Sequence, residues 1–269
     1  AYLVKTTVSV SNNFTSITGA GPSQWNSVAI ILANTDTNLP ATGLVTGTYK
    51  VYAVDAESNL SGASVDNVTI AGLVDIDGNG YSTVVIGTQT WMAENLKVTK
   101  YRNGDNITHI TTNSDWANDT DGAYGYYDNN TTNRDTYGML YNWYAVDNSS
   151  GLCPEGWQVP TSAEFTVLYD YLENIDSKVG GQLKETGTDH WQIEYSGTSN
   201  SSGFTGLPGG YRHGDNGNDY GVGNSGFFWS STENNNYYAW YRLLNYDYSA
   251  INRFDSHKKG GFSVRCIRD

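Results

Sequence analysis

Apolar and polar residues alternate in short segments along the first quarter of the chain, which is the pattern of strands that bury one face. Alternation and β-branched residues predict strands at residues 2–10, 28–33, 48–56 and 65–70. Gly-Pro, Asn-Leu-Pro and Ser-Gly segments separate these strands and are typical of turns. The pattern therefore predicts a small all-β sandwich over residues 1–72.

Helical periodicity first appears well after residue 72. Apolar residues between positions 165 and 172 recur on one helical face, and Thr161 with Glu164 forms a capping-box pattern, so we predict a helix over residues 161–172. A second, shorter helix is expected over residues 177–186, although two adjacent glycines weaken it.

No helical period is present from residue 201 to the end of the chain. Short aromatic segments such as residues 226–230 and 239–244 alternate there with turns rich in Gly, Asn and Ser, and they predict strands. We therefore expect residues 73–269 to form a second domain, a β-rich α+β domain with two short helices.

The charge of the 269-residue chain excludes some classes of partner. It has 28 acidic and 15 basic residues, a formal net charge of −13, which repels phosphate backbones, so no nucleic-acid partner is expected. The longest apolar run, residues 28–33, is far shorter than the roughly 20 residues of a membrane-spanning helix. We expect no membrane insertion.

The two cysteines, Cys153 and Cys266, leave one possible disulfide, with two buried free thiols as the alternative. A bridge would close a loop of 266 − 153 = 113 residues. In an oxidising compartment, such a loop would stabilise the fold by roughly 4–5 kcal/mol.

Candidate motifs for metal binding and catalysis fail on inspection. Residues 75–80 (DIDGNG) begin like an EF-hand loop, but the twelfth position is Ile86 where a bidentate Glu is required, so we predict a hairpin turn. The histidines lack the spacing of metal ligands. No sequence motif for a catalytic nucleophile, a phosphate-binding loop or a dinucleotide site is present. No pair of carboxylates stands out as the acid and base of a glycoside hydrolase. We expect no catalytic residues, no metal and no cofactor.

Residues 211–259 differ in composition from the rest of the chain, because asparagine and tyrosine are concentrated there with Asp, Ser, Gly and His. Tyr offers a large rigid contact area and Asn, Ser and Gly offer adaptable hydrogen bonds, as in antibody loops. The alternative is that the segment is an Asn-rich surface without a binding role. This alternative has weight because Trp229, Trp240, Phe262 and Val264 indicate that part of the region is core strand.

Two parts of the chain resemble known families. Residues 47–61 (GTYKVYAVDAESNLS) are similar to strands of bacterial surface immunoglobulin-like modules, which implies a spacer. From residue 73 onward the chain resembles the Fibrobacter succinogenes major paralogous domain family, through residues 83–97 (TVVIGTQTWMAENLK), 137–146 (YGMLYNWYAV), 152–160 (LCPEGWQVP), 203–210, 229–233 (WSSTE) and 261–269 (GFSVRCIRD). This resemblance implies a C-type-lectin-like fold, a Cys153–Cys266 disulfide and a C-terminus that pairs near the start of the domain.

The family is similar in turn to variable proteins of diversity-generating retroelements, in which adenines of the C-terminal coding segment are randomised. Randomising an AAC codon never yields Trp, Lys, Glu, Gln or Met. Between presumed fixed anchors, residues 226–260 contain positions that fit this rule: Asn234, Asn235, Asn236, Tyr237, Tyr238, Leu243, Asn245, Asp247, Tyr248, Ala250, Asn252, Phe254, Asp255, Ser256 and His257. The Glu-Pro-Asn and Trp-Asn-Asp motifs of calcium-dependent lectins are absent.

These patterns predict a non-enzymatic protein on a cell or virus-particle surface that binds an unidentified protein or other surface ligand. Tyr237, Tyr238, Tyr248 and Phe254 would be the anchoring aromatics, and the polar positions would set specificity. A carbohydrate-binding or carbohydrate-active module is the alternative, and a structural envelope module is a third possibility. We expect a monomer, because no heptad repeat or long apolar edge is present.

Overall fold

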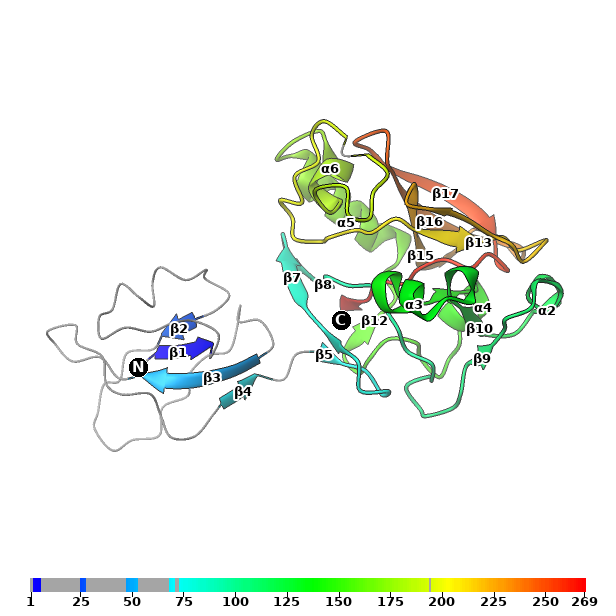
Figure 1. The fold of residues 1–269 in the computed structure, drawn as a ribbon, viewed down its shortest axis with the longest axis horizontal. Helices are drawn as coiled ribbons and strands as arrows, with labels where there is room; N and C mark the ends of the chain where they lie inside the picture. Colours follow the sequence, from blue (N-terminus) through cyan, green and yellow to red (C-terminus); the bar gives the residue numbers. More distant parts are fainter. Residues whose placement is uncertain (1, 6–24, 28–46, 53–67, 71–72, 194) are drawn as a thin grey trace, which may run out of the picture. The chain divides into compact units, whose positions relative to one another are not determined.

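The computed structural model describes residues 2–5, 25–27, 47–52, 68–70, 73–193 and 195–269 (Figure 1). The chain divides into two compact units, Ala1–Leu73 and Val74–Asp269. No helix in these described ranges is long and apolar enough to cross a bilayer.

The first unit contains one antiparallel sheet among its described residues, with the strand order β2-β1-β3-β4. Its strands are β1 (Tyr2–Lys5), β2 (Trp25–Ser27), β3 (Gly47–Tyr52) and β4 (Val68–Ile70). Three of them overlap predicted strands, and β2 was not predicted. The predicted strand at residues 28–33 lies outside the described residues.

The second unit is mixed α+β and rich in strands. A five-stranded sheet has the order β14-β13-β15-β16-β17, and a four-stranded sheet has the order β12-β18-β8-β7. Two smaller sheets are formed by β11-β10-β9 and β5-β6. The strands are β5 (Leu73–Val74), β6 (Gly80–Tyr81), β7 (Thr83–Ile86), β8 (Gln89–Met92), β9 (Thr108–His109), β10 (Ala123–Gly125), β11 (Leu140–Tyr141), β12 (Trp157–Gln158), β13 (Gly209–Arg212), β14 (Asp219–Val222), β15 (Ser225–Glu233), β16 (Tyr238–Asn245), β17 (Ile251–His257) and β18 (Ile267–Arg268).

The C-terminal strand β18 lies between β8 and β12, where Ile267 pairs with Trp91 and Arg268 pairs with Trp157. The expectation that the C-terminus returns to the start of the domain is therefore confirmed. Figure 1 shows the end of the chain beside β12, close to elements from the beginning of the unit.

The longest described helix, α5 (Ser162–Glu173), begins where the sequence predicts it. The Thr161 hydroxyl accepts the Glu164 main-chain N–H, and the Glu164 carboxylate accepts the Thr161 main-chain N–H, which completes the capping box. The second predicted helix is confirmed as the shorter α6 (Val179–Leu183).

The expectation of only two helices is wrong. Three further short helices and one 3-10 turn are present in the described part of the second unit: α2 (Asn113–Asn118), η1 (Tyr127–Asn129), α3 (Thr131–Tyr137) and α4 (Trp143–Val146). Each is at most two turns long, which is too short for a hydrophobic period to appear in the sequence. The side chains of Asn130 and Asn142 cap α3 and α4 by accepting main-chain N–H groups.

The main hydrophobic core lies between α5, α6 and the two larger sheets. Trp91 packs against Phe165 of α5, with ring centroids 5.2 Å apart, and Phe204 packs against both Trp91 and Phe228. Leu168 and Leu172 of α5 are buried in the same cluster, as the helical period predicts. The core is completed by residues from the following positions: Ile86, Val179, Leu183, Trp191, Leu244, Ile251 and Ile267.

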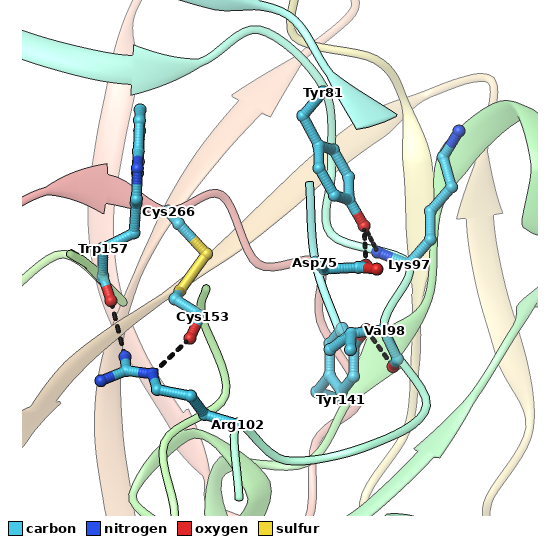
Figure 2. Close-up of a disulfide and its surroundings, with 9 residues drawn as sticks. All are labelled: Asp75, Tyr81, Lys97, Val98, Arg102, Tyr141, Cys153, Trp157 and Cys266. Carbon is cyan, nitrogen blue, oxygen red and sulfur yellow. Dashed lines mark hydrogen bonds between the residues drawn. A yellow bond between two sulfur atoms is a disulfide. The ribbon is translucent and has the colours of Figure 1, made fainter. Parts of the chain in front are cut away.

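Cys153 and Cys266 form the single disulfide of the chain (Figure 2). Both residues are almost fully buried. The Arg102 guanidinium donates to the main-chain carbonyls of Cys153 and Trp157, at 3.0 and 2.8 Å, so it holds the segment that carries Cys153 (Figure 2). The bridge joins this segment to the C-terminal end of the chain.

Residues 75–79 form the turn between β5 and β6, as expected for a hairpin. The Asp75 carboxylate accepts hydrogen bonds from the main-chain N–H groups of Asp77 and Asn79. It also accepts the Tyr81 hydroxyl at 2.6 Å (Figure 2). These donors occupy the carboxylate oxygens that a calcium ion would need. No group of three or more His, Cys, Asp or Glu side chains in the described ranges is placed to hold a metal ion.

Removing the disulfide is expected to destabilise the domain strongly. The bridge closes a loop of 113 residues, and in the chain-entropy model a loop of this length stabilises the folded state by roughly 4–5 kcal/mol. The double variant Cys153→Ala/Cys266→Ala should lose about this amount of unfolding free energy in urea denaturation. An unchanged denaturation midpoint would contradict the structural role of the bridge.

Candidate functional site

Eight of the fifteen predicted contact residues lie on β16 and β17, and the other seven lie in the turns on either side of β16. Tyr241 of β16 lies opposite Trp229 of β15 on one side and opposite Phe254 of β17 on the other. Residues directly opposite one another share a sheet face, and alternate residues along a strand point to opposite faces. The register therefore decides which side chains of this hairpin pair lie together.

One face of these strands belongs to the protein core. Phe228, Leu244 and Ile251 are buried there beneath α5. The guanidinium of Arg242, on the same face, lies 5.8 Å from the Phe165 ring centroid and donates to the Thr166 hydroxyl. This part of the face is buried, whereas Trp240, Arg253 and Asp255 on the same face are half-buried or exposed.

The other face of the sheet carries a continuous cluster of aromatic rings, which we call the aromatic face. Its rings lie 4.2–6.2 Å apart between successive centroids. The cluster consists of Tyr211, Phe227, Trp229, Tyr241, Phe254 and Phe262.

Exposure increases from one side of the aromatic face to the other. Trp229 and Phe262 are buried, Tyr241 is half-buried, and Phe254 is 47% exposed. Burial raises the pKa of Tyr241 to about 12, so its hydroxyl stays protonated at neutral pH. Phe254 is thus an exposed ring supported by a rigid aromatic base.

The turn between β15 and β16 presents the most exposed predicted residues. Asn235 orders this turn, because its side-chain carbonyl accepts the main-chain N–H groups of Tyr237 and Tyr238. The Asn234 amide donates to the Asp255 carboxylate of β17 at 2.8 Å. Tyr237, which is 67% exposed, is therefore displayed on a hydrogen-bonded turn.

Beside this turn lies an open pocket of about 310 Å³. It is lined by Tyr211, Arg212, His213, Gly214, Asp215, Tyr238, Asp255, Ser256, His257, Gly260 and Phe262. Its walls come from the end of β13, the end of β17 and the segment that follows β17.

The two histidines of the pocket are held in similar ways. His213 Nδ1 accepts the main-chain N–H of Asp215, and His257 Nδ1 accepts that of Lys259. Burial lowers the pKa of His257, so this ring is neutral at pH 7. Since its Nδ1 is an acceptor, its Nε2 carries the proton and can donate to a ligand oxygen.

The opposite end of the sheet holds a second group of predicted residues, at the turn between β16 and β17. The Lys184 ammonium donates to the main-chain carbonyls of Asn245 and Tyr248, at 2.9 and 2.8 Å. The Gly180 N–H donates to the Ser249 carbonyl. These bonds fix the turn through its main chain. Side chains contribute as well, because the Asn245 side chain accepts the Asp247 N–H and the Tyr248 hydroxyl accepts the Asn252 amide.

The fifteen predicted contact residues therefore fall into three groups. The structure brings Asn234, Asn235, Asn236, Tyr237, Tyr238, Asp255, Ser256 and His257 together at the pocket end of the sheet. Leu243, Asn252 and Phe254 lie along the aromatic face. Asn245, Asp247, Tyr248 and Ala250 lie at the far end of the strands, away from the pocket.

Sequence reasoning did not single out three residues of the pocket wall, Tyr211, His213 and Asp215. Tyr211 lies in β13 and the other two follow it, and β13 ends more than ten residues before the proposed variable segment. The Asn- and Tyr-rich composition of residues 211–259 is the sequence signal that includes these three residues. Trp240, expected in the core, is half-buried and carries the Arg253 guanidinium over its ring, 3.7 Å from the centroid.

The family model of the Fibrobacter succinogenes major domain matches residues 84–268, more than half of the chain. The chain belongs to this family. The family resemblance of the sequence motifs is thus confirmed, and the match spans the sheet, the pocket and the disulfide. Neither a curated protein nor a solved structure matches the chain.

In this Fibrobacter succinogenes major domain, the buried Lys184 should make stability depend on pH. Burial lowers the pKa of Lys184 from 10.5 to about 8 in the folded state. Between these values the unfolded chain binds the proton and the folded chain does not, so stability contributed by Lys184 rises with pH, by at most about 1.4 kcal/mol per pH unit.

The measurement compares the wild-type chain with Lys184→Met. The difference in unfolding free energy, wild type minus variant, should increase between about pH 8 and pH 9.5, below the titration of the tyrosines. A difference that stays constant or falls over this window would show that Lys184 is not desolvated in the folded state.

Proposed function

We propose that this Fibrobacter succinogenes major domain is a non-enzymatic binding protein on the surface of a cell or virus particle. In this proposal the domain has a C-type-lectin-like fold, and an immunoglobulin-like spacer precedes it. Its ligand is a protein or other surface molecule, bound by the aromatic face and the turn beside the pocket. The buried disulfide supports an oxidising, extracellular compartment.

The observation that carries the proposal is the display of exposed aromatic side chains on an ordered base. Tyr237, Phe254 and Tyr238 are 67%, 47% and 41% exposed. The main-chain N–H groups of Tyr237 and Tyr238 donate to the Asn235 side chain, which orders their backbone. The Phe254 ring is ordered by its contact with the Tyr241 ring. Aromatic anchors that are ordered before binding lose little entropy when a ligand arrives.

The roles of residues in segment 226–260 support diversification by a retroelement. Trp229, Glu233 and Lys258 are types that a randomised AAC codon cannot yield, and they serve the scaffold. The Trp229 indole N–H donates to the Tyr141 carbonyl, and the Lys258 ammonium pairs with Glu233 at 2.8 Å and lies over the Trp143 ring. The exposed positions between these anchors are of the types that randomisation allows.

The pocket favours one alternative, a carbohydrate-binding module. Tyr211 and Tyr238 could stack on a sugar ring, while Asp215, Asp255 and His257 could bind hydroxyl groups. Its volume of about 310 Å³ is at the lower end of the range typical of small-molecule sites.

Binding is tested with a panel of purified surface-protein ectodomains and, in parallel, a glycan array. For a protein ligand found in this way, the variant Tyr237→Ala/Tyr238→Ala/Phe254→Ala should lose affinity at least about 30-fold, because a hot-spot aromatic contributes about 2 kcal/mol or more. Tyr171→Ala is the matched control, because Tyr171 is 44% exposed on α5. Unchanged affinity in the triple variant refutes the assignment, and binding to glycans alone favours the carbohydrate module.

Diversification is tested at the encoding locus. We expect a near-copy of the segment that encodes residues 226–266, a reverse-transcriptase gene nearby, and differences between isolates confined to template adenines. Differences spread evenly over all bases, or the lack of any near-copy, would make the Tyr- and Asn-rich surface a fixed feature of the family.

A further inference from the structure

The strand β17 forms one edge of the five-stranded sheet, with β16 on one side only (Figure 1). Three consecutive residues in its middle, Arg253, Phe254 and Asp255, are exposed. An edge strand presents main-chain N–H and C=O groups that another strand can pair with. The question is which main-chain groups of β17 point outward.

Two observations define the hydrogen-bonding phase of β17. The Lys258 N–H donates to the Tyr237 carbonyl, so these two residues form a hydrogen-bonded pair. Hydrogen-bonded and non-hydrogen-bonded pairs alternate in antiparallel strands, so the pairs of Asn252, Phe254 and Ser256 with β16 are hydrogen-bonded. On the other side of β16, the Tyr246 N–H donates to the Asn224 carbonyl, which gives the same phase.

It follows that the main-chain groups of Ile251, Arg253, Asp255 and His257 point away from β16, toward the open edge. No hydrogen bond joins the main chain of Arg253 or Asp255 to another residue in the described part of the chain. The edge is therefore available for a further antiparallel strand.

We infer that β17 pairs with β17 of a second copy of this chain, antiparallel and centred on Phe254. In this register Arg253 lies opposite Asp255 of the second copy, and Asp255 lies opposite Arg253 of that copy. These are the residues whose main-chain groups point outward, so the hydrogen bonds and the opposite charges coincide.

Neighbouring registers are unfavourable. Centring the pair on Arg253 or on Asp255 places like charges opposite one another, which destabilises a strand pair. Charged residues often protect an edge strand from pairing, but here the signs are symmetric about Phe254 and favour one self-pairing register. The register is therefore specified by charge as well as by hydrogen bonding.

Arg253 also lacks a carboxylate partner within one copy. Arg253 lies directly opposite Arg242, and no ion pair involves Arg253 among the described residues. Burial, and then the charge of Arg253, lowers the pKa of Arg242 to about 10. Asp255 of a second copy would place a negative charge beside this pair of like charges.

Pairing about a twofold axis perpendicular to the sheet would keep equivalent faces on the same side. Phe254 would lie beside Phe254 of the second copy, and the two aromatic faces would form one continuous surface. This consequence rests on the proposed binding function, and a bivalent surface would raise the avidity for a repetitive ligand. The pairing itself does not depend on that function.

Self-association is measured by analytical ultracentrifugation of the full chain without ligand, over a wide concentration range at physiological ionic strength. We expect a monomer–dimer equilibrium. Arg253→Asp and Asp255→Arg should each weaken dimerisation about tenfold. The double variant Arg253→Asp/Asp255→Arg, in which the charges are exchanged, should restore it.

The single variants change the formal net charge of −13 in opposite directions, to −15 and −11. If both variants dimerise more weakly, the cause therefore cannot be a change in the net repulsion between two chains. Asp247→Arg is the matched control, because it makes the same charge change at an exposed residue outside β17 and should leave dimerisation unchanged. Circular dichroism verifies that each variant is folded.

Amide hydrogen exchange gives a second readout. The amides of Arg253 and Asp255 should become protected with increasing protein concentration, whereas those of Asn252 and Phe254 are already bonded to β16. A chain that stays monomeric at millimolar concentration, or a charge-exchanged variant as defective as the single variants, overturns the inference. If the amides of Arg253 and Asp255 become protected only when a ligand is added, the open edge of β17 binds the ligand and not a second copy, which also overturns the inference. None of these outcomes alters the test of the binding function.

Discussion

The return of the C-terminal segment through the middle of the second unit is the constraint on which the remaining structure depends. After β17 the chain pairs with β15 through Ser263, buries Arg265 and Phe262, forms the disulfide at Cys266 and ends as a strand between β8 and β12. Because one short segment joins both larger sheets, the sheet that carries the proposed binding surface and the start of the second unit are held together.

Buried cations hold this arrangement through main-chain atoms. Arg212 donates to the carbonyls of Ile110 and Gly217, Arg265 donates to those of Phe204 and Thr205, and Lys184 binds the turn after β16. Bonds to carbonyls do not depend on the side chains of the residues that accept them. At the turn between β16 and β17, the Lys184 bonds therefore require no particular side chain at Asn245 or Tyr248. The turn between β15 and β16 differs, because the side chains of Asn234 and Asn235 order it.

Several elements could be predicted because their signals are local. The capping box and the apolar period of α5, and the aromatic strands that became β15 and β16, lie within continuous segments of the sequence. The disulfide followed from the family resemblance. The helices α2, α3 and α4 gave no such signal, because they are short and are ordered by caps and by tertiary contacts.

The sequence by itself determined the composition of the proposed binding surface, the α+β class of the second unit and the family. Only the tertiary structure decided which predicted residues share a surface. The strand register separates Tyr237 from Tyr248 by the length of β16, and it brings Tyr211 and His213 to the pocket from a different part of the chain. Register and the pairing of distant strands depend on the packing of the whole core, which no local pattern contains.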